Sequence, residues 1–119
     1  MMVDVAVRRE SAGVLRRGAE FRNAMDRGVR LSGKRMVLYV VPREQGIRVG
    51  FVTGRGLGGA VQRNRARRRL KEAWRSLTPR VEDGYDVVVA SRPGLEDAKT
   101  QELTAEMEEL LVLGRLVRR

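Results

Sequence analysis

The sequence predicts a single α+β domain in which three helices pack on one β-sheet. Two observations carry this prediction. Three segments place apolar residues at helical spacing, and the apolar, β-branched runs between them have the length of strands. A chain of 119 residues also suits one domain, because single domains centre on about 100–150 residues. The predicted order of helix, strands, helix, strand, helix describes one small sandwich.

The first predicted helix spans residues 15–27. Phe21, Ala24 and Met25 fall at i, i+3 and i+4 on one helix face, and Gly28 follows as a residue that ends the helix. Residues 1–12 alternate charged and small apolar residues without a clear period. We expect them to form a mobile arm.

A β-hairpin is predicted next. Its strands are the apolar runs 36–41, which Pro42 stops, and 47–53. Residues 29–33 suggest a further short strand before the hairpin. Four glycines within residues 54–59 then predict a loop, because glycine interrupts regular structure.

Residues 60–77 form the strongest predicted helix, which Pro79 ends. One face of this helix is apolar and suited to pack on a sheet. The residues of this face are Ala66, Leu70, Ala73, Trp74 and Leu77. The opposite face is polar and mostly cationic. Its residues are Asn64, Arg68, Lys71 and Arg75.

A buried strand and an acidic helix complete the prediction. Residues 85–90 are apolar and β-branched, and their place after the long helix implies a crossover connection. The last helix has an apolar stripe and an acidic side. The stripe consists of Leu103, Met107, Leu110 and Leu111. We expect residues 114–119 to be frayed.

Charge is the most unusual property of the composition. The formal net charge is +10, and residues 1–95 hold 21 of the 25 Lys and Arg residues but 9 of the 15 Asp and Glu residues. One part of the surface is therefore far more positive than the average. The chain has no Cys and no His, which excludes a zinc finger, a thiol nucleophile and an imidazole base. No apolar run reaches the about 18 residues of a membrane span, so we expect a cytoplasmic protein.

The densest charge lies within the long helix. Residues 63–75 hold seven cations and a single carboxylate, Glu72. Cations at i and i+4 repel each other by about 0.2–0.5 kcal/mol, and a bound polyanion would relieve that cost. One alternative to polyanion binding is a solvated helix face, but such faces usually mix positive and negative residues. A second alternative is a helix that lies on a membrane surface, but its apolar side would have to be free to contact lipid.

The glycines ahead of this helix also suggest a phosphate contact, because exposed N–H groups at a helix N-terminus attract anions. Segment 54–59 lacks the Gly-Lys-Ser/Thr ending of a nucleotide-binding loop, so we favour the backbone of a nucleic acid. A DNA-reading helix mixes base-reading polar residues with its cations, and Asn64 alone has that character here. This composition favours RNA over DNA.

The strand before the glycine loop and the cationic helix together carry a recognisable set of motifs. They are Gly50-Phe51-Val52-Thr53, Gly58, Ala60-Val61, Arg63-Asn64-Arg65, Arg67-Arg68 and Lys71-Glu72-Ala73. This set resembles the signature of the protein component of bacterial ribonuclease P, the ribonucleoprotein that removes 5′ leaders from precursor tRNA. The resemblance covers roughly residues 14–112 and includes Phe21, Gly28 and the strands at 37–39 and 86–89.

The resemblance implies a mostly antiparallel four-stranded sheet with three helices in the order α-β-β-β-α-β-α. This arrangement is like the second domain of a small-subunit ribosomal protein. The resemblance also implies a left-handed β-α-β crossover through residues 60–77, against the usual right-handed rule.

Two sets of RNA-contact residues are implied as well. The set that contacts the catalytic RNA subunit is Arg63, Asn64, Arg65, Arg67, Arg68 and Lys71, to which the outward spacing adds Arg75. The set that lines a cleft for the single-stranded 5′ leader, between the first helix and the sheet, is Phe21, Met25, Met36 and Tyr39, with Arg55 nearby. Residue type alone would also allow these apolar side chains to be ordinary core. The chain departs from the family pattern at two places that bear on leader affinity: Gly54-Arg55-Gly56 replaces the usual Ser-Lys-Lys, and Met25 replaces a second aromatic residue.

No carboxylate cluster suited to phosphodiester hydrolysis is apparent, because the acidic residues gather on the last helix. In the family the RNA subunit holds Mg²⁺ and performs the hydrolysis. We therefore expect no catalytic residue, metal ligand or cofactor in this chain, and we expect ribonuclease P RNA and precursor tRNA as partners. A structural RNA-binding protein of the ribosome is the alternative function.

Overall fold

A computed structural model describes residues 2–7, 18–54 and 58–117, with side chains from residue 21 onward. Its strands are β1 (Met2–Val7), β2 (Val29–Ser32), β3 (Met36–Pro42), β4 (Ile47–Thr53) and β5 (Tyr85–Ser91). Its helices are α1 (Gly18–Arg27), α2 (Ala60–Leu77) and α3 (Thr100–Leu113). None of the described helices is both long enough and apolar enough to cross a membrane.

All five strands belong to one sheet, in the order β1-β4-β5-β3-β2. β4 and β5 are parallel neighbours, with Gly50 opposite Val88, and the chain between them runs through α2. The other three pairs of strands are antiparallel. The predicted α+β class, the mostly antiparallel sheet and the crossover connection are therefore confirmed.

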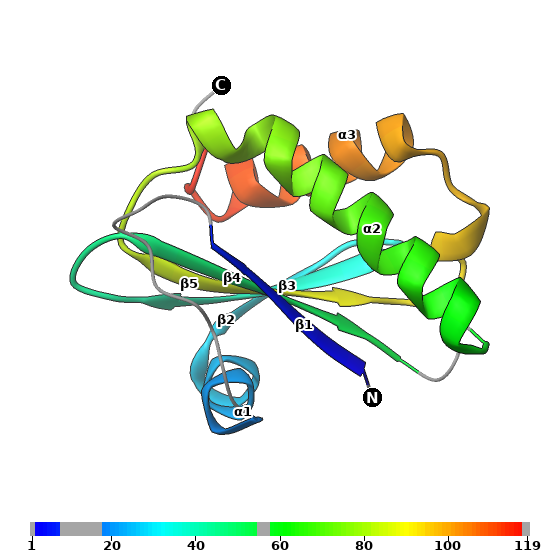
Figure 1. Cartoon of the computed structure of the whole chain (residues 1–119). Coiled ribbons are helices and arrows are strands. Elements are labelled where there is room, and N and C mark those ends of the chain that lie inside the picture. The colour runs from blue at the N-terminus through cyan, green and yellow to red at the C-terminus, as the bar shows by residue number, and fades with distance from the viewer. Residues whose placement is uncertain (1, 8–17, 55–57, 118–119) are drawn as a thin grey trace.

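The helices cover both faces of the sheet (Figure 1). α2 and α3 lie side by side on one face, and α1 lies on the other. Successive residues of a strand point to opposite faces. Accordingly, Val49 and Phe51 of β4 join the apolar cluster under α2 and α3, whereas Val52 joins the cluster under α1. The molecule therefore has two different outer surfaces, one on each side of the sheet.

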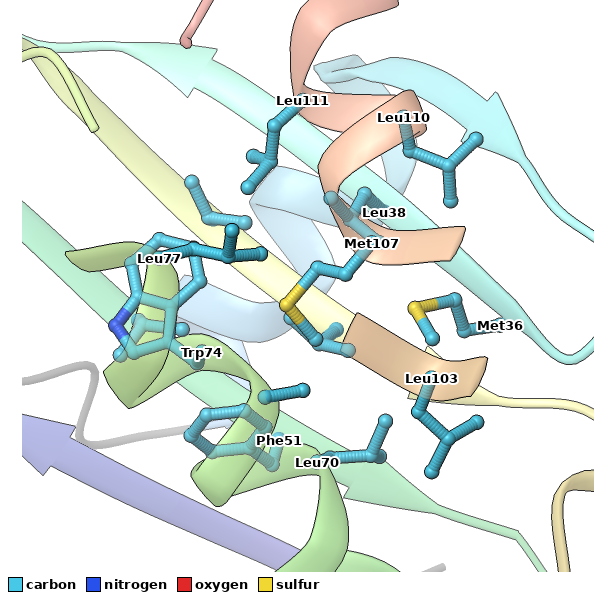
Figure 2. Close-up of a cluster of buried hydrophobic side chains, with 14 of the residues drawn as sticks. Met36, Leu38, Phe51, Leu70, Trp74, Leu77, Leu103, Met107, Leu110 and Leu111 are labelled. Atoms are coloured by element: carbon cyan, nitrogen blue, oxygen red, sulfur yellow. The ribbon is translucent and has the colours of Figure 1, made fainter. Parts of the chain in front are cut away.

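The larger apolar cluster lies between the sheet and the pair of helices α2 and α3 (Figure 2). Phe51 of β4, Leu70 of α2 and Met107 of α3 are fully buried there. Trp74, the only tryptophan of the chain, is 4% exposed in the same cluster. Burying a side chain of this size contributes about 1.5–3 kcal/mol, so the cluster determines which side of α2 faces inward.

β1 has no counterpart among the predicted elements. It pairs antiparallel with β4 along its whole length, with Met2 opposite Thr53 and Val7 opposite Arg48. Val3, Val5 and Val7 are β-branched residues at alternate positions, which is the spacing of a strand. The expectation of a mobile arm is wrong for residues 2–7, and the sheet has a fifth strand at its edge. Residues 8–12 lie outside the described part of the chain.

The chain after α3 returns to the core. Leu116 is 1% exposed, and Val117 forms an isolated β-bridge with Val81. The backbone N–H of Glu82 donates to the carbonyl of Leu116 at 2.8 Å. These bonds and the apolar burial outweigh the tendency of a chain end to fray. The expectation of a frayed end is therefore wrong for residues 114–117, and residues 118–119 lie outside the described part.

Candidate nucleic-acid interface

The orientation of α2 is set by its apolar face. Five residues of this face are buried, and they are the five predicted core residues. They are Ala66, Leu70, Ala73, Trp74 and Leu77. Because an α-helix repeats about every 3.6 residues, the opposite side of α2 points away from the sheet.

The outward side of α2 is cationic and open to solvent. Arg65, Arg68 and Arg75 are exposed, and none of the three has a carboxylate within ion-pair distance among the described residues. The first turn of α2 contains no acidic residue, and Glu72 is the only carboxylate in the helix. α2 thus presents the predicted docking face to solvent, with little compensating charge of its own.

A shallow hollow of about 270 Å³ lies on the outward side of α2. It is lined by four of the predicted RNA-contact residues, namely Asn64, Arg67, Arg68 and Lys71. The guanidinium of Arg67 donates a hydrogen bond through Nη2 to Oδ1 of Asn64. The hollow therefore gathers three cations around one amide.

Two arginines of α2 bind the chain itself. Arg63 donates through Nη1 to the carbonyl of Gly58 at 2.7 Å, in the loop before the helix. Arg69 donates through Nη1 to the carbonyls of Glu96 at 3.0 Å and Ala98 at 2.8 Å, just before α3. Arg63, a predicted RNA contact, thus commits one guanidinium nitrogen to the glycine loop. Arg69 joins α2 to the segment before α3, and nothing in the sequence distinguishes it from its neighbours.

The α1 side of the sheet carries a smaller apolar cluster. Phe21 of α1 packs with Val52 and Val88, and Tyr39 lies against this cluster. The structure thus brings Phe21 and Tyr39 together on the predicted side. The Phe21 ring is only 3% exposed and offers no open face for stacking, whereas Tyr39 and Met25 are half-buried.

Met36 lies on the other side of the sheet. Its side chain is fully buried in the cluster under α2 and α3, where Figure 2 shows it near Leu103. Met36 and Tyr39 are three residues apart in β3, and an odd separation places strand side chains on opposite faces. The prediction that Met36 lines the leader cleft is therefore wrong. Arg55 lies outside the described residues.

The carboxylates of α3 hold other parts of the chain. Glu106 accepts hydrogen bonds at Oε2 from the backbone N–H groups of Arg35 at 2.8 Å and Met36 at 3.2 Å, in the turn before β3. Glu108 forms an ion pair with Arg80 at 2.9 Å, next to the end of α2. The only sequence signal for Glu106 is its place beside Met107 in the apolar stripe.

Glu102 closes the first turn of α3. Its Oε1 accepts a hydrogen bond from the backbone N–H of Lys99 at 2.9 Å. This bond holds the pKa of Glu102 below the ordinary value of 4.5, and the nearby Arg35 guanidinium lowers that pKa further. Among the described residues no three acidic side chains gather as metal ligands.

The sequence and the fold match one family of proteins. The family model described as ribonuclease P matches residues 10–113. The ribonuclease P protein component of Chloroflexus aggregans is 47% identical over 102 residues, which cover 84% of this chain and 76% of that protein. The same component from Symbiobacterium thermophilum is 42% identical over 101 residues, which cover 83% of this chain and 88% of that protein.

Solved structures show the same fold. The ribonuclease P protein of Staphylococcus aureus superposes with a TM-score of 0.78 at 21% identity, covering 87% of this chain and 96% of that one. The ribonuclease P protein from Thermotoga maritima superposes with a TM-score of 0.74 at 24% identity, covering 82% of this chain and 93% of that one.

The α+β fold, the outward cationic helix and these relatives together define the class of this protein. It is an RNA-binding protein of a ribonucleoprotein. Within that class, the chain belongs to the ribonuclease P protein family. The predicted resemblance is confirmed. A protein component of ribonuclease P is part of an endoribonuclease complex that processes tRNA with an RNA partner.

Proposed function

We propose that this chain binds the catalytic RNA subunit of ribonuclease P and the 5′ leader of precursor tRNA, and so promotes removal of the leader. The observation that carries this proposal is the outward side of α2. There Arg65, Arg68 and Arg75 are exposed, without carboxylate partners among the described residues. Cations on a rigid helix can bind RNA phosphates with little reorganisation.

The outward side of α2 suits the backbone of a folded RNA. The only aromatic residue of the helix, Trp74, is buried on the opposite side. Unpaired bases are usually held by aromatic stacking, whereas structured RNA is recognised largely through phosphates and sugars. We therefore assign the RNA subunit to α2.

The α1 side of the sheet suits the single-stranded leader. Tyr39 is half-buried beside the Phe21 cluster and remains partly accessible to solvent. An aromatic ring stacks on any base and contributes about 1–3 kcal/mol. We assign leader contacts to Tyr39 and Met25, and we assign to Phe21 the task of holding α1 on the sheet.

In this proposal the chain lowers the repulsion between two RNAs, and the RNA subunit performs the hydrolysis. Mg²⁺ would be held by RNA phosphates, since carboxylates such as Glu106 and Glu108 already bind the chain itself. The protein should therefore reduce the Mg²⁺ concentration that cleavage requires. The complex would work in the cytoplasm, and neither DNA nor a membrane is a partner.

Reconstitution with ribonuclease P RNA tests the assignment of α2. The double variant Arg68→Ala, Lys71→Ala should bind this RNA more weakly and cleave less precursor tRNA at low Mg²⁺. The slope of log affinity against log salt should fall by about 1.4–1.8, because each lost phosphate contact removes about 0.7–0.9. Lys34→Ala with Arg115→Ala is the matched control, because both cations are exposed outside α2. An unchanged slope, or an equal loss in the control, contradicts the assignment.

Comparison of two tRNA ligands tests the leader assignment. Tyr39→Ala should reduce the preference for leader-bearing precursor over mature tRNA by about 5- to 100-fold, because one stacking contact is lost. Tyr39→Phe should retain most of the preference, because it keeps the ring. An unchanged ratio in Tyr39→Ala means that the leader binds elsewhere.

A further inference from the structure

We propose that Arg30, on the edge strand β2, binds a phosphate group of the single-stranded leader next to the base that stacks on Tyr39. The proposal rests on the proposed function, because it assumes that the leader lies on the α1 side of the sheet. It adds a cation to the leader contacts assigned to Tyr39 and Met25.

Two observations place the Arg30 side chain on the α1 side of the sheet. Arg30 stands directly opposite Tyr39 in the antiparallel pair of β2 and β3. Residues directly opposite each other point to the same face, with Cβ atoms about 4.5–5.5 Å apart. The next residue, Leu31, is buried in the cluster under α2 and α3, and successive strand residues point to opposite faces. Arg30 and Tyr39 are therefore neighbours on the side that carries Phe21.

The Arg30 side chain is exposed at the edge of the sheet. β2 is the last strand in the order, so it has a neighbouring strand on one side only. No ion pair or hydrogen bond joins the Arg30 guanidinium to another described residue. The only carboxylate in strands β2 to β5, Asp86, accepts hydrogen bonds from Arg48 at 2.7 and 2.6 Å. The charge of Arg30 is therefore not neutralised by these strands.

The chain just before Arg30 is tightly packed. α1 ends at Arg27, and Gly28 alone separates it from β2. The backbone N–H of Gly28 donates to the carbonyl of Ala24 at 2.8 Å. A Cβ atom at Gly28 would collide with this carbonyl and would lie 3.0 Å from the carbonyl oxygen of Val40. The corner between α1 and β2 thus packs on backbone, which fixes the position of Arg30 relative to α1.

Arg30 and Tyr39 together offer both kinds of contact that a single-stranded nucleic acid uses. An aromatic ring stacks on a base, and a cation beside it binds the backbone. The two unesterified oxygens of a phosphate diester accept the paired donors of a guanidinium. A phosphate contact weakens as salt rises, because binding releases counterions from the RNA. Arg30 should therefore give leader binding a salt-dependent component on the α1 side.

A holoenzyme reconstituted from the full chain and ribonuclease P RNA tests this contact. Arg30→Ala should lower the preference for leader-bearing precursor over mature tRNA by about 3- to 10-fold, the effect of one exposed hydrogen-bonded contact. The salt slope of precursor binding should fall by about 0.7, the value for one phosphate of a single strand. Arg115→Ala is the matched control and should change neither quantity, because Arg115 is exposed but follows α3 on the opposite side of the sheet.

Leaders that carry one uncharged methylphosphonate linkage locate the phosphate. With the unmodified chain, one such linkage should reduce the preference by the same factor as Arg30→Ala. With Arg30→Ala, that linkage should cost less than about twofold, because its cationic partner is already absent. Equal losses in the two proteins at every linkage overturn the inference, because Arg30 then binds no particular leader phosphate.

Salt dependence separates phosphate binding from an effect on the Tyr39 ring. A guanidinium can also lie against an aromatic ring and hold it in place. In that case Arg30→Ala lowers the preference for precursor but leaves the salt slope unchanged, and this result overturns the inference. Arg30→Lys keeps the charge but not the paired donors, so it should retain the slope and lose part of the preference.

Tyr39→Ala distinguishes failure of this inference from failure of the proposed function. If Tyr39→Ala lowers the preference for precursor and Arg30→Ala does not, the leader lies on the α1 side and only the role of Arg30 fails. If neither variant changes the preference, the assignment of the leader to the α1 side fails as well.

Discussion

α2 and α3 lie side by side and share one apolar cluster, yet their outer sides carry opposite charge. α2 has seven cations and one carboxylate, whereas α3 has four carboxylates and no cation. On α3, Glu106 binds the turn before β3 and Glu108 forms an ion pair. On α2, Arg65 and Arg68 have no such partner among the described residues. Charge on α3 therefore supports the fold, whereas α2 keeps exposed cations that no described carboxylate neutralises.

The difference between the two helices separates packing from recognition. Their inner sides are alike, because any helix on this sheet must bury an apolar stripe. Their outer sides are free to differ, because exposed residues contribute little to stability. This separation can be tested by substitutions on the inner and outer sides of each helix.

The inner sides of the two helices should be equivalent. Leu70 of α2 and Leu103 of α3 are both fully buried in the shared cluster. Leu70→Ala and Leu103→Ala should each lower the free energy of unfolding by about 2–5 kcal/mol, through lost burial and a cavity. Urea unfolding followed by Trp74 fluorescence measures both. A loss below about 1 kcal/mol in either variant would show that the two helices do not share the core equally.

Two adjacent arginines of α2 should respond in opposite ways. Arg69→Ala removes hydrogen bonds to the carbonyls of Glu96 and Ala98 and should cost about 1–3 kcal/mol of stability. Arg68→Ala should change stability by less than about 0.5 kcal/mol, because Arg68 is exposed. RNA binding should show the reverse order. Equal losses of stability in Arg69→Ala and Arg68→Ala would mean that the two arginines do not have separate roles in folding and in RNA binding.

Removing one outer charge from each helix should affect RNA binding only on α2. Arg65→Ala should weaken binding to ribonuclease P RNA by about 3- to 10-fold and reduce the salt slope by about 0.7–0.9. Glu109 lies on the exposed side of α3. Glu109→Gln should leave the salt slope of RNA binding unchanged, because this substitution neither removes nor adds a contact to phosphate. Filter binding at several salt concentrations measures both slopes. A lower slope in Glu109→Gln would place α3 in the interface.

The smallest expected effect concerns the first turn of α3. The pKa of Glu102 is lowered by the Lys99 N–H, so its charged form stabilises the folded chain above the ordinary pKa of 4.5. This contribution is lost as the pH falls through the lower pKa of the folded state. Glu102→Gln should therefore be slightly less stable at neutral pH and equal to the unmodified chain in strong acid. Urea midpoints across this range measure it, and a constant difference between the two proteins would argue against a role for the carboxylate.

Much of the fold follows from periodicity in the sequence. The bounds of α2 and β4 agree with the prediction, and β2, β3, β5 and α3 lie where apolar runs or stripes place them. β1 was not predicted because its partner strand, β4, lies far along the chain. Leu116 and Val117 were missed for a related reason, because they pair with Glu82 and Val81, which lie well before them in the chain.

The candidate site was predictable in part. Helical spacing correctly placed Arg68 and Arg75 outward, because the opposite residues of α2 are apolar. The alternation of side chains along β3 could have shown that Met36 and Tyr39 lie on opposite faces. The role of Arg69 in binding the chain itself could not be recognised, because the carbonyls that accept its hydrogen bonds lie 27 and 29 residues away.

β5 lies in the middle of the sheet although it is the last strand along the chain. Before residues 85–91 are synthesised, the other strands can form only the separate pairs of β1 with β4 and β2 with β3. Isolated two-stranded pairs are marginal in water, and a helix without its packing surface is also unstable. During translation the sheet that supports the cationic surface can therefore be completed only after residues 85–91 have been made.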